Sequence, residues 1–533
     1  MYTKRITALA LALIMTASVS AGCSGKNSSA GGANATPISE KDKYAKEIKV
    51  SAAKGVKESI PVENNLLAKV MKEKFNLVMD TTEIPQSDYV TKMSMLFASG
   101  EPPEFIYSLR PDYKLSEWTS AGYLKGFTED EINSRFPNYK KQYEDKEWPS
   151  VFKSLRNTDN KLYYFPGHRP DNVNMAWVYR EDTMKSLNLS YPKTTDEIYN
   201  VLLKIKESTG KVPYVSANGG NQCLWAFSGF LQSFGMPELS IRDLSYVDPT
   251  TKKFVPYAFS EDNYRNFLKY MSKLYKDGLI WKEFATATAD QTKKFQTQGN
   301  GFVLWGYPEK IAEYNNISKS ADANASWTWA KDMPSAYSDK TYYKREPYYN
   351  AEGIGFSSNI TDEKLARMFD YLNWACTDEG MILHTYGVEG VTYQKKDGKI
   401  VYADNMVTPI KATGDKAGKY GINGSAGFIK THPDIKSVYR PVVEEVEKNF
   451  MNKANYLFFE APALQYTDEE NKKLADMITS INDTQNEYAA RFIMGQLDPN
   501  NDADWKKYID TMNKIGLDNF KKIRTDAYNR GNK

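Results

Sequence analysis

Cysteine and histidine are scarce in this sequence, which holds three of each in 533 residues. It contains no HExxH motif and no paired-cysteine spacing of the kind that binds zinc. It also contains no phosphate loop, so any ATP hydrolysis would belong to another chain. The acidic run Asp498–Asp504 lacks the Gly and Glu that a calcium loop requires, and it is better explained as a helix N-terminus. We therefore predict neither a metal nor a cofactor.

Long hydrophobic runs are also rare, and the only one lies at the start of the chain. It extends from Ile6 to about Val19, preceded by Lys4 and Arg5 and followed by small residues up to Cys23. This pattern predicts a secretory signal peptide at residues 1–22. A membrane-spanning helix needs about 20 apolar residues, which is more than this run supplies. The mean hydropathy of −0.61 and the lack of a second run exclude a multi-span membrane protein.

Cys23 is the predicted site of lipidation. The small residues before it resemble the bacterial lipobox, although Ser20 stands where that motif usually has Leu. Residues 23–41 are rich in Gly, Ser, Ala and Asn, which is typical of a flexible linker. We expect a globular body that is anchored by lipid to the cell membrane on its extracytoplasmic face. The alternative is ordinary cleavage that leaves Cys23 unmodified.

The chain also lacks a large excess of positive or of negative residues. The chain has 70 Lys and Arg against 67 Asp and Glu, and Lys4 and Arg5 account for two of the three net positive charges. This balance gives no reason to expect nucleic acid as a partner. Single cores stop growing at about 250–300 residues, so the length predicts two lobes. We predict that Cys223 and Cys376 are buried free thiols, and a disulfide between them is the alternative.

Predicted strands and helices alternate in the first part of the globular body. Strands are expected at 47–52, 77–81 and 104–107, with helices at 62–75 and 87–99 between them. This order predicts an α/β sheet with crossover connections.

Further helices are marked by their capping residues. The capping box Thr194-Thr195-Asp196-Glu197 begins a helix that runs to Gly210. A helix opening at Thr361 is expected to end at Gly380, and Asp504 is expected to cap one near the C-terminus.

Six short motifs in a fixed order then suggest a family. They are FASGEPPE at 97–104, DNKLYYFP at 159–166, WVYR at 177–180, YRNFLKYMSKLYKDGLI at 264–280, FQTQGNGFVLW at 295–305 and YGVEGVTY at 386–393. In this order they resemble the extracellular solute-binding proteins of the sugar-binding family, particularly the large lipoprotein members of oligosaccharide importers in Gram-positive bacteria. The resemblance covers the chain from about residue 46 to the C-terminus.

The resemblance implies an α/β, two-lobed, periplasmic-binding-protein-like fold with a ligand cleft between the lobes. It implies lobe one at 42–171 plus 350–400 and lobe two at 172–349 plus 401–533. It also implies a monomer that captures an oligosaccharide by hinge closure and delivers it to the permease subunits of an ABC importer, without catalysis. Some relatives carry a calcium loop after the helix that corresponds to 194–206. Here that stretch, 207–211, is too poor in carboxylates.

Candidate ligand-binding residues lie after strands or in Gly-containing loops, where open α/β sheets bind their ligands. Arg110 follows the third predicted strand, and its guanidinium suits vicinal hydroxyls or a sugar acid. Aromatic rings stack on the apolar faces of sugars, although each of them could equally pack a core. Glu389 could equally hold its own loop together. The predicted set is Arg110, Trp177, Trp225, Trp305, Tyr307, Tyr386 and Glu389.

Two other functions fit the same composition. A secreted glycoside hydrolase would also combine aromatics with carboxylates, but 67 acidic residues make a chance pair uninformative. A solute-sensing partner of a membrane receptor would share the fold of a binding protein.

Overall fold

The computed structural model describes residues 43–56, 65–110, 114–169, 175–216, 223–237, 244–345, 347–396, 399–402, 420–421, 441–459 and 462–532. The predicted signal peptide and the whole predicted linker, with Cys23, lie outside these ranges. The chain divides into two compact units, residues 1–45 and 46–533, and the elements below belong to the second.

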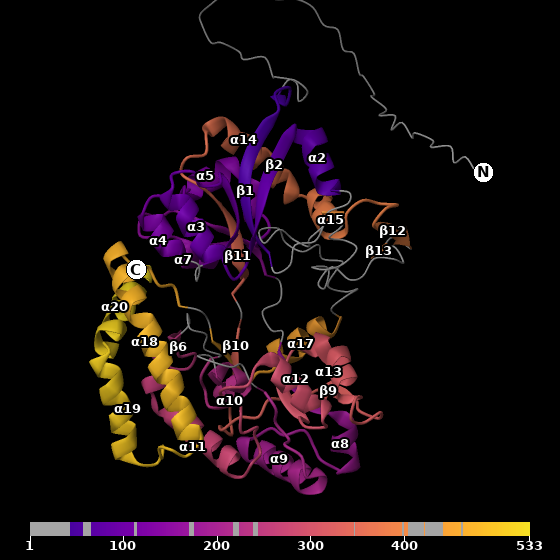
Figure 1. Ribbon diagram of the computed structural model, residues 1–533, viewed down its shortest axis with the longest axis vertical. Coiled ribbons are helices and arrows are strands. Elements are labelled where there is room, and N and C mark those ends of the chain that lie inside the picture. The colour runs from indigo at the N-terminus through magenta and orange to yellow at the C-terminus, as the bar shows by residue number, and fades with distance from the viewer. Residues whose placement is uncertain are drawn as a thin grey trace, which may run out of the picture. The chain divides into compact units, whose positions relative to one another are not determined.

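A five-stranded sheet, which we call the lobe-one sheet, has the strand order β2-β1-β3-β11-β4. β1 runs parallel to β2 and β3, whereas β11 runs antiparallel to β3 and β4. The helices α2 and α14 pack against its strands (Figure 1). The predicted α/β alternation is confirmed. The strands are β1 (Ile48–Val56), β2 (Leu77–Pro85), β3 (Phe105–Leu109), β4 (Phe165–His168) and β11 (Tyr349–Phe356).

The helices around this sheet are α2 (Leu66–Phe75), α3 (Tyr89–Ala98), α4 (Leu115–Ser120), α5 (Glu129–Arg135), α6 (Pro137–Lys140), α7 (Trp148–Leu155), α14 (Asp362–Ala375) and α15 (Asp378–Tyr386). The expectation that Gly380 ends the helix opened by Thr361 is wrong. That helix, α14, ends at Ala375, and Gly380 lies in the first turn of α15. A Cβ atom at Gly380 would lie 2.2 Å from the carbonyl oxygen of Trp374, so glycine permits the sharp turn between the two helices.

The second lobe is built on a three-stranded antiparallel sheet, the lobe-two sheet, in the order β8-β5-β9. Its strands are β5 (Ala176–Arg180), β8 (Val303–Gly306) and β9 (Trp327–Trp329). Within the described ranges there are also three two-stranded sheets, formed by β6 (Tyr246–Val247) with β7 (Phe254–Val255), β10 (Thr341–Lys344) with β14 (Tyr456–Phe459), and β12 (Tyr393–Lys396) with β13 (Lys399–Tyr402).

The helices of this lobe surround a large apolar core. They are α8 (Glu181–Ser186), α9 (Thr195–Thr209), α10 (Ser228–Ser233), α11 (Asp262–Lys276), α12 (Ala289–Thr297), α13 (Ile311–Ser318) and α17 (Pro441–Met451), with 3₁₀ turns at Cys223–Phe227, Ala258–Ser260 and Pro308–Lys310. The capping box predicted at Thr194 is confirmed. Its hydroxyl accepts from the Glu197 amide at 3.2 Å, and α9 ends at Gly210 in the left-handed conformation.

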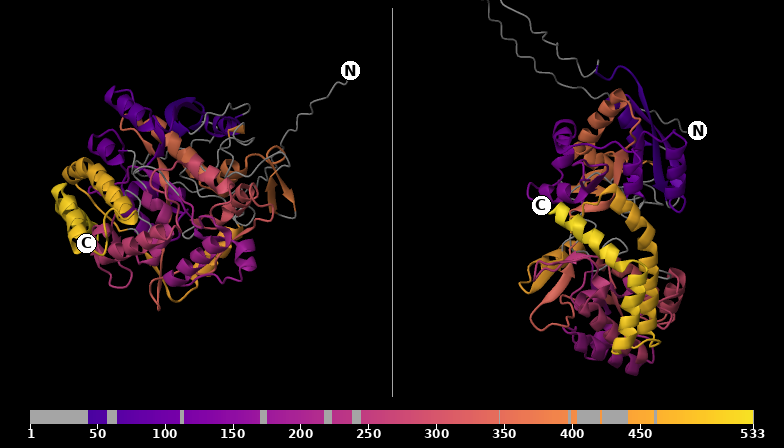
Figure 2. Two further views of the ribbon diagram at one scale, coloured as in Figure 1. Left: turned by 60° about the horizontal axis from the view of Figure 1, so that its bottom comes forward. Right: turned by 90° about the vertical axis from the view of Figure 1, so that its left-hand side faces the viewer.

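Three helices close the chain and lie side by side (Figures 1 and 2). They are α18 (Asp468–Ile493), α19 (Asp502–Lys514) and α20 (Leu517–Gly531). α18 packs against α11 of lobe two, and Asp468 at its start accepts a hydrogen bond of 2.6 Å from Ser120 of α4. The prediction that Asp504 caps α19 is wrong, because Asn501 is the cap and Asp504 lies in the first turn.

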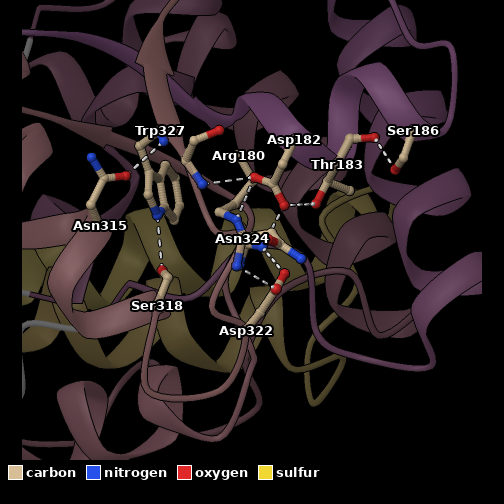
Figure 3. Close-up of polar contacts among 10 residues, drawn as sticks. Arg180, Asp182, Thr183, Ser186, Asn315, Ser318, Asp322, Asn324 and Trp327 are labelled. Atoms are coloured by element: carbon tan, nitrogen blue, oxygen red, sulfur yellow. Dashed lines mark hydrogen bonds and ion pairs between the residues drawn. The ribbon is translucent and has the colours of Figure 1, made fainter.

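A buried arginine fixes one end of the lobe-two sheet. Arg180, the last residue of β5, lies between two carboxylates (Figure 3). It donates two hydrogen bonds to Asp182, at 2.8 and 2.6 Å, and a third to Asp322 at 2.6 Å. Asp182 also accepts from the Ser326 amide at 3.1 Å. Burial would raise the pKa of Asp182, but these donors outweigh it and lower the pKa. The network joins α8 and the turn before β9 to β5.

Of the two remaining cysteines, the structure describes the side chain of Cys376 but not that of Cys223. Cys376 is a buried free thiol, as predicted, and burial raises its pKa. Its sulfur accepts a hydrogen bond of 3.2 Å from Gln142. The side chain of Cys223 lies outside the described part of the structure.

Candidate functional site

The chain connects the two main sheets through one edge of each. It leaves the lobe-one sheet after His168 and enters the lobe-two sheet at Ala176. It returns from Lys344 and enters β11 at Tyr349, which pairs with His168. Since β11 runs antiparallel to β3 and β4, its start lies beside the carboxyl ends of those two strands. The carboxyl ends of β1, β2, β3 and β4 therefore share the edge from which the connections run.

The lobe-two sheet presents a corresponding edge. β8 runs antiparallel to β5, and Ala176 at the start of β5 pairs with Gly306 at the end of β8. The connection from lobe one therefore arrives where β8 ends. Open α/β sheets bind ligands outside the carboxyl ends of their strands. The two edges together form the candidate site.

On the lobe-one edge, Arg110 follows β3 directly and is half-buried. Ser108, two residues before it, donates a hydrogen bond of 2.9 Å to Glu352 of β11. Lys54, near the end of β1, pairs in register with Glu83 of β2. Burial lowers the pKa of Lys54, and the charges of Glu83 and Glu352 offset this only in part. The edge thus combines a charged hydrogen bond with an ammonium group that is partly withdrawn from water.

Sequence reasoning did not find Lys54, Ser108 or Glu352 as members of this edge. One signal was available: Glu352 is the only charged residue in the otherwise uncharged stretch 348–361. Ser108 gives no such signal, because its unusual backbone angle, φ 59°, appears only in the folded chain.

On the lobe-two edge, Trp305 belongs to β8 and Trp177 to β5. Both are buried in the core, with 8% and 0% of their surface exposed, and their ring centroids are 5.9 Å apart. A Cβ atom at Gly229 of α10 would lie 2.8 Å from the Trp177 ring and 3.0 Å from Trp305. Tyr343 packs against Trp305 at 6.0 Å. Glycine therefore lets α10 approach both indoles closely.

This indole cluster contains buried donors that lack acceptors. Within the described residues, Trp177 Nε1 and Trp305 Nε1 have no hydrogen-bond partner. Gln232, one turn after Gly229, accepts from the Lys344 amide at 2.8 Å through its oxygen, but its Nε2 has no partner. Most buried polar groups in proteins are paired, so these donors are available to an acceptor from a ligand or an ordered water.

Of the other predicted ligand-binding residues, Tyr307 lies at the lobe-two edge, Tyr386 and Glu389 lie in or after α15, and the side chain of Trp225 is not described. Tyr307, directly after β8, is half-buried at the lobe-two edge, and its amide donates to the Tyr314 hydroxyl at 3.2 Å. Tyr386 ends α15 and is fully buried in a small cluster with Tyr393. Glu389 is half-exposed and forms an ion pair of 3.4 Å with Lys395. The backbone of Trp225 lies in a 3₁₀ turn, and its side chain is not described.

Lysine ammonium groups lie at both ends of the stretch 207–211, where the sequence predicts no calcium loop. Residues 207–211 follow directly on Lys206, whose ammonium donates to the carbonyl oxygen of Asp277 at 2.5 Å. Lys211 donates likewise to Gln298 at 3.0 Å. Calcium requires six to eight oxygen ligands, and two ammonium groups at this position oppose it.

In the part of the chain that the structure describes, no helix is both long and apolar enough to cross a membrane. No three or more His, Cys, Asp or Glu side chains converge there on a point that could hold a metal ion.

Residues 67–382, more than half of the chain, match the family described as bacterial extracellular solute-binding protein. The chain belongs to this family. Among curated relatives of this solute-binding protein, the fructooligosaccharide ABC transporter substrate-binding protein FusA of Streptococcus pneumoniae serotype 4 is 23% identical over 480 residues, covering 84% of this chain and 83% of FusA. The polygalacturonan/rhamnogalacturonan-binding protein YtcQ of Bacillus subtilis is 22% identical over 496 residues, covering 88% and 91%.

Solved structures confirm the fold class of this solute-binding protein. The alginate-binding protein AlgQ2, crystallised without calcium ion, superposes with a TM-score of 0.68 at 19% identity, covering 90% of this chain and 98% of AlgQ2. FusA in complex with kestose superposes with a TM-score of 0.66 at 19% identity, covering 91% and 99%. The predicted two-lobed, periplasmic-binding-protein-like α/β fold is therefore correct. The predicted lobe bounds stay a prediction.

Proposed function

We propose that this protein captures an oligosaccharide outside the cytoplasm and delivers it to the permease subunits of an ABC importer. Family membership over residues 67–382 carries the proposal. Curated relatives that match over most of their length include one named for fructooligosaccharide and one for polygalacturonan. The same relatives favour capture over hydrolysis, so the protein acts by binding and closure, without covalent chemistry.

The candidate site supports a sugar ligand because it combines aromatic rings with polar groups. Arg110 and Tyr307 follow strands at the two edges, and Trp177 and Trp305 lie directly beneath the second edge. Sugar rings offer apolar faces to aromatic side chains and hydroxyls to polar ones. We place the ligand between these two edges. Tyr386, Glu389 and Trp225 stay in the predicted set, although no contact described for them joins them to either edge.

The decisive experiment measures binding directly. Isothermal titration with a panel of plant and microbial oligosaccharides should give a saturable heat with at least one of them. Incubation of the same oligosaccharides with the protein should leave their length unchanged. The absence of heat with every member of the panel would contradict the proposal, and shortened products would favour a glycoside hydrolase instead.

We further propose that Cys23 carries the lipid that holds the protein at the membrane. A curated relative, the lipoprotein LipO of Bacillus subtilis, is 23% identical over 442 residues. A single acyl chain binds a membrane only marginally, whereas two or more hold it firmly. Mass spectrometry of the mature protein should find diacylglycerol on Cys23, and Cys23→Ala should release the protein into the medium. A free thiol at Cys23 in the mature protein would refute the anchor.

A permease partner and a monomeric state complete the proposal. Co-purification from membranes in mild detergent should recover the permease subunits, and sizing of the soluble body should give the mass of one chain. Recovery of a receptor kinase in place of a permease would favour the sensor alternative.

A further inference from the structure

Three arginines lie at the edge of the lobe-one sheet or in the connection that enters it. Arg110 directly follows β3, and Arg169 directly follows β4. Arg345 directly follows β10, where its amide donates to the carbonyl oxygen of Phe459 at 3.2 Å, and the connection then enters β11, the strand between β3 and β4. The carboxyl ends of β3 and β4 and the start of β11 share one edge, and the Arg169 amide donates to the carbonyl oxygen of Tyr348, on whose ring the Arg345 guanidinium lies. The net charge of the whole chain is only +3, so this grouping is local.

Arg345 is a partly buried guanidinium without a carboxylate. It donates to the hydroxyl of Tyr348 and lies 4.8 Å from the centroid of that ring. Its Nε is buried and has no partner among the described residues, and no described carboxylate forms an ion pair with it. Arg180 and Arg530, by contrast, each hold a carboxylate at 2.6 to 2.9 Å. A desolvated guanidinium without an anion is costly, so Arg345 fits a site that receives its anion from outside.

Lys54 is a second partly buried cation that forms no ion pair with a described carboxylate. It lies at the carboxyl end of β1 in the same sheet. Glu83 and Glu352 act on it only through their charges, and Glu352 already accepts from Ser108. An added anion near Lys54 would offset the loss of water around its ammonium.

Across the connections, the unsatisfied atoms of the indole cluster are also donors. Trp177 Nε1, Trp305 Nε1 and Gln232 Nε2 each have a hydrogen to give and no described acceptor. Arg345 Nε adds a fourth. A hydroxyl both donates and accepts, whereas a carboxylate only accepts, at about four lone-pair sites. These four donors therefore match carboxylates better than they match hydroxyls.

We infer that the captured oligosaccharide carries carboxylate groups, as a chain of uronic acids does. The inference rests on the proposed function and narrows its ligand class. In this arrangement a ligand carboxylate takes two parallel hydrogen bonds from an arginine at the lobe-one edge. The ammonium of Lys54 lies at the same edge as a second cationic contact. At the lobe-two edge the half-buried ring of Tyr307 engages the sugar body, and the donors of the indole cluster take further carboxylates of the chain.

Isothermal titration of the mature soluble body with two matched probes tests this ligand class. One probe is a mixture of short oligogalacturonates and oligoalginates, and the other is the same mixture with every carboxylate methyl-esterified. We expect the acids to bind at least about tenfold more tightly than the esters and to lose affinity as salt rises. Equal or tighter binding of the esters, or tight binding of neutral fructooligosaccharide alone, would overturn the inference while leaving the proposed function standing. No binding of any oligosaccharide would overturn both.

Single variants locate the effect. Arg345→Gln and Lys54→Met remove a charge while keeping most of each side chain, and Arg491→Gln on α18 is the matched control. We expect each of the first two to lower the ratio of acid to ester affinity several-fold and the control to leave it unchanged. This ratio is insensitive to a general loss of folded protein, because both probes report on the same sample. An unchanged ratio in both Arg345→Gln and Lys54→Met would overturn the inference.

Discussion

Ser108 donates a hydrogen bond of 2.9 Å to the carboxylate of Glu352, a residue 244 positions later in the chain. Ser108 lies in β3 and Glu352 in β11, so the bond joins two neighbouring strands of the lobe-one sheet close to the edge from which the lobe connections run. Ser108 holds this position with φ at 59°, a backbone conformation that favours glycine. The site edge therefore contains a charged hydrogen bond that depends on an unfavourable backbone angle.

Replacement of Ser108 should separate these two contributions. Ser108→Ala removes the donor and keeps the strained angle, and should lower the free energy of unfolding by about 1–3 kcal/mol. Ser108→Gly also removes the donor but adopts φ 59° readily, so its loss should be smaller by about 1 kcal/mol. Urea denaturation followed by tryptophan fluorescence measures both. A glycine variant less stable than the alanine variant would show that the backbone angle at position 108 does not destabilise the folded protein.

Trp305 should respond differently to truncation and to loss of its Nε1 donor. Trp305→Ala empties a buried position beside Trp177 and Tyr343 and should cost about 3–5 kcal/mol of unfolding free energy. Trp305→Phe keeps a smaller aromatic ring there and removes the unpaired donor, so its stability should fall less than that of the alanine variant while its oligosaccharide affinity falls.

Calorimetric melting and isothermal titration of the two Trp305 variants measure these effects. Trp281→Phe is a matched control, since Trp281 is buried against Phe295 at 4.7 Å in a separate cluster. Unchanged oligosaccharide affinity in Trp305→Phe would show that Nε1 of Trp305 does not contribute to ligand binding.

His384 should make stability depend on pH below neutrality. Its Nδ1–H donates to the carbonyl of Gly380 at 2.7 Å, and its Nε2 accepts from the Tyr371 hydroxyl at 2.9 Å. Burial lowers the pKa of His384 from 6.5 to about 4. The unfolded state therefore binds a proton more readily than the folded one. The contribution of His384 is complete above pH of about 6.5 and is lost as pH falls toward 4, amounting to about 3 kcal/mol.

Melting temperatures recorded between pH 4 and 8 test the role of His384. His384→Gln should flatten the dependence between pH 4 and 6.5 compared with the parent protein and leave the region above pH 7 parallel to it. An unchanged slope between pH 4 and 6.5 would show that other groups cause the loss.

Arg180 should be among the residues of lobe two whose replacement is most costly. Arg180→Met leaves Asp182 without its main partner and should cost about 3–5 kcal/mol. Arg180→Lys keeps the charge but loses the paired hydrogen bonds, so an intermediate cost is expected. Asp322→Asn, at a half-exposed carboxylate, should cost least. Urea denaturation of the three variants measures this order, and a methionine variant as stable as the parent would contradict it.

Much of the fold was accessible from the sequence because its signals are local. Capping residues such as Thr194 and alternating strands such as β1 act over a few positions, and the order of motifs added the family and its two-lobed fold. The error at Gly380 also has a physical cause. A glycine after an apolar helix usually ends it, but this one allows a close approach between two helices that sequence alone does not reveal.

The sequence by itself determined the lobe-one alternation, the main helices and the candidate positions Arg110, Trp305 and Tyr307 after or within strands. Only the tertiary structure decided which of these positions share an edge, and that Trp177 and Trp305 meet across β5 and β8 with their donors unpaired. It also revealed Lys54, Ser108 and Glu352. Pairing between β3 and β11 joins residues more than 240 positions apart, and such contacts follow from strand order, which no local pattern specifies.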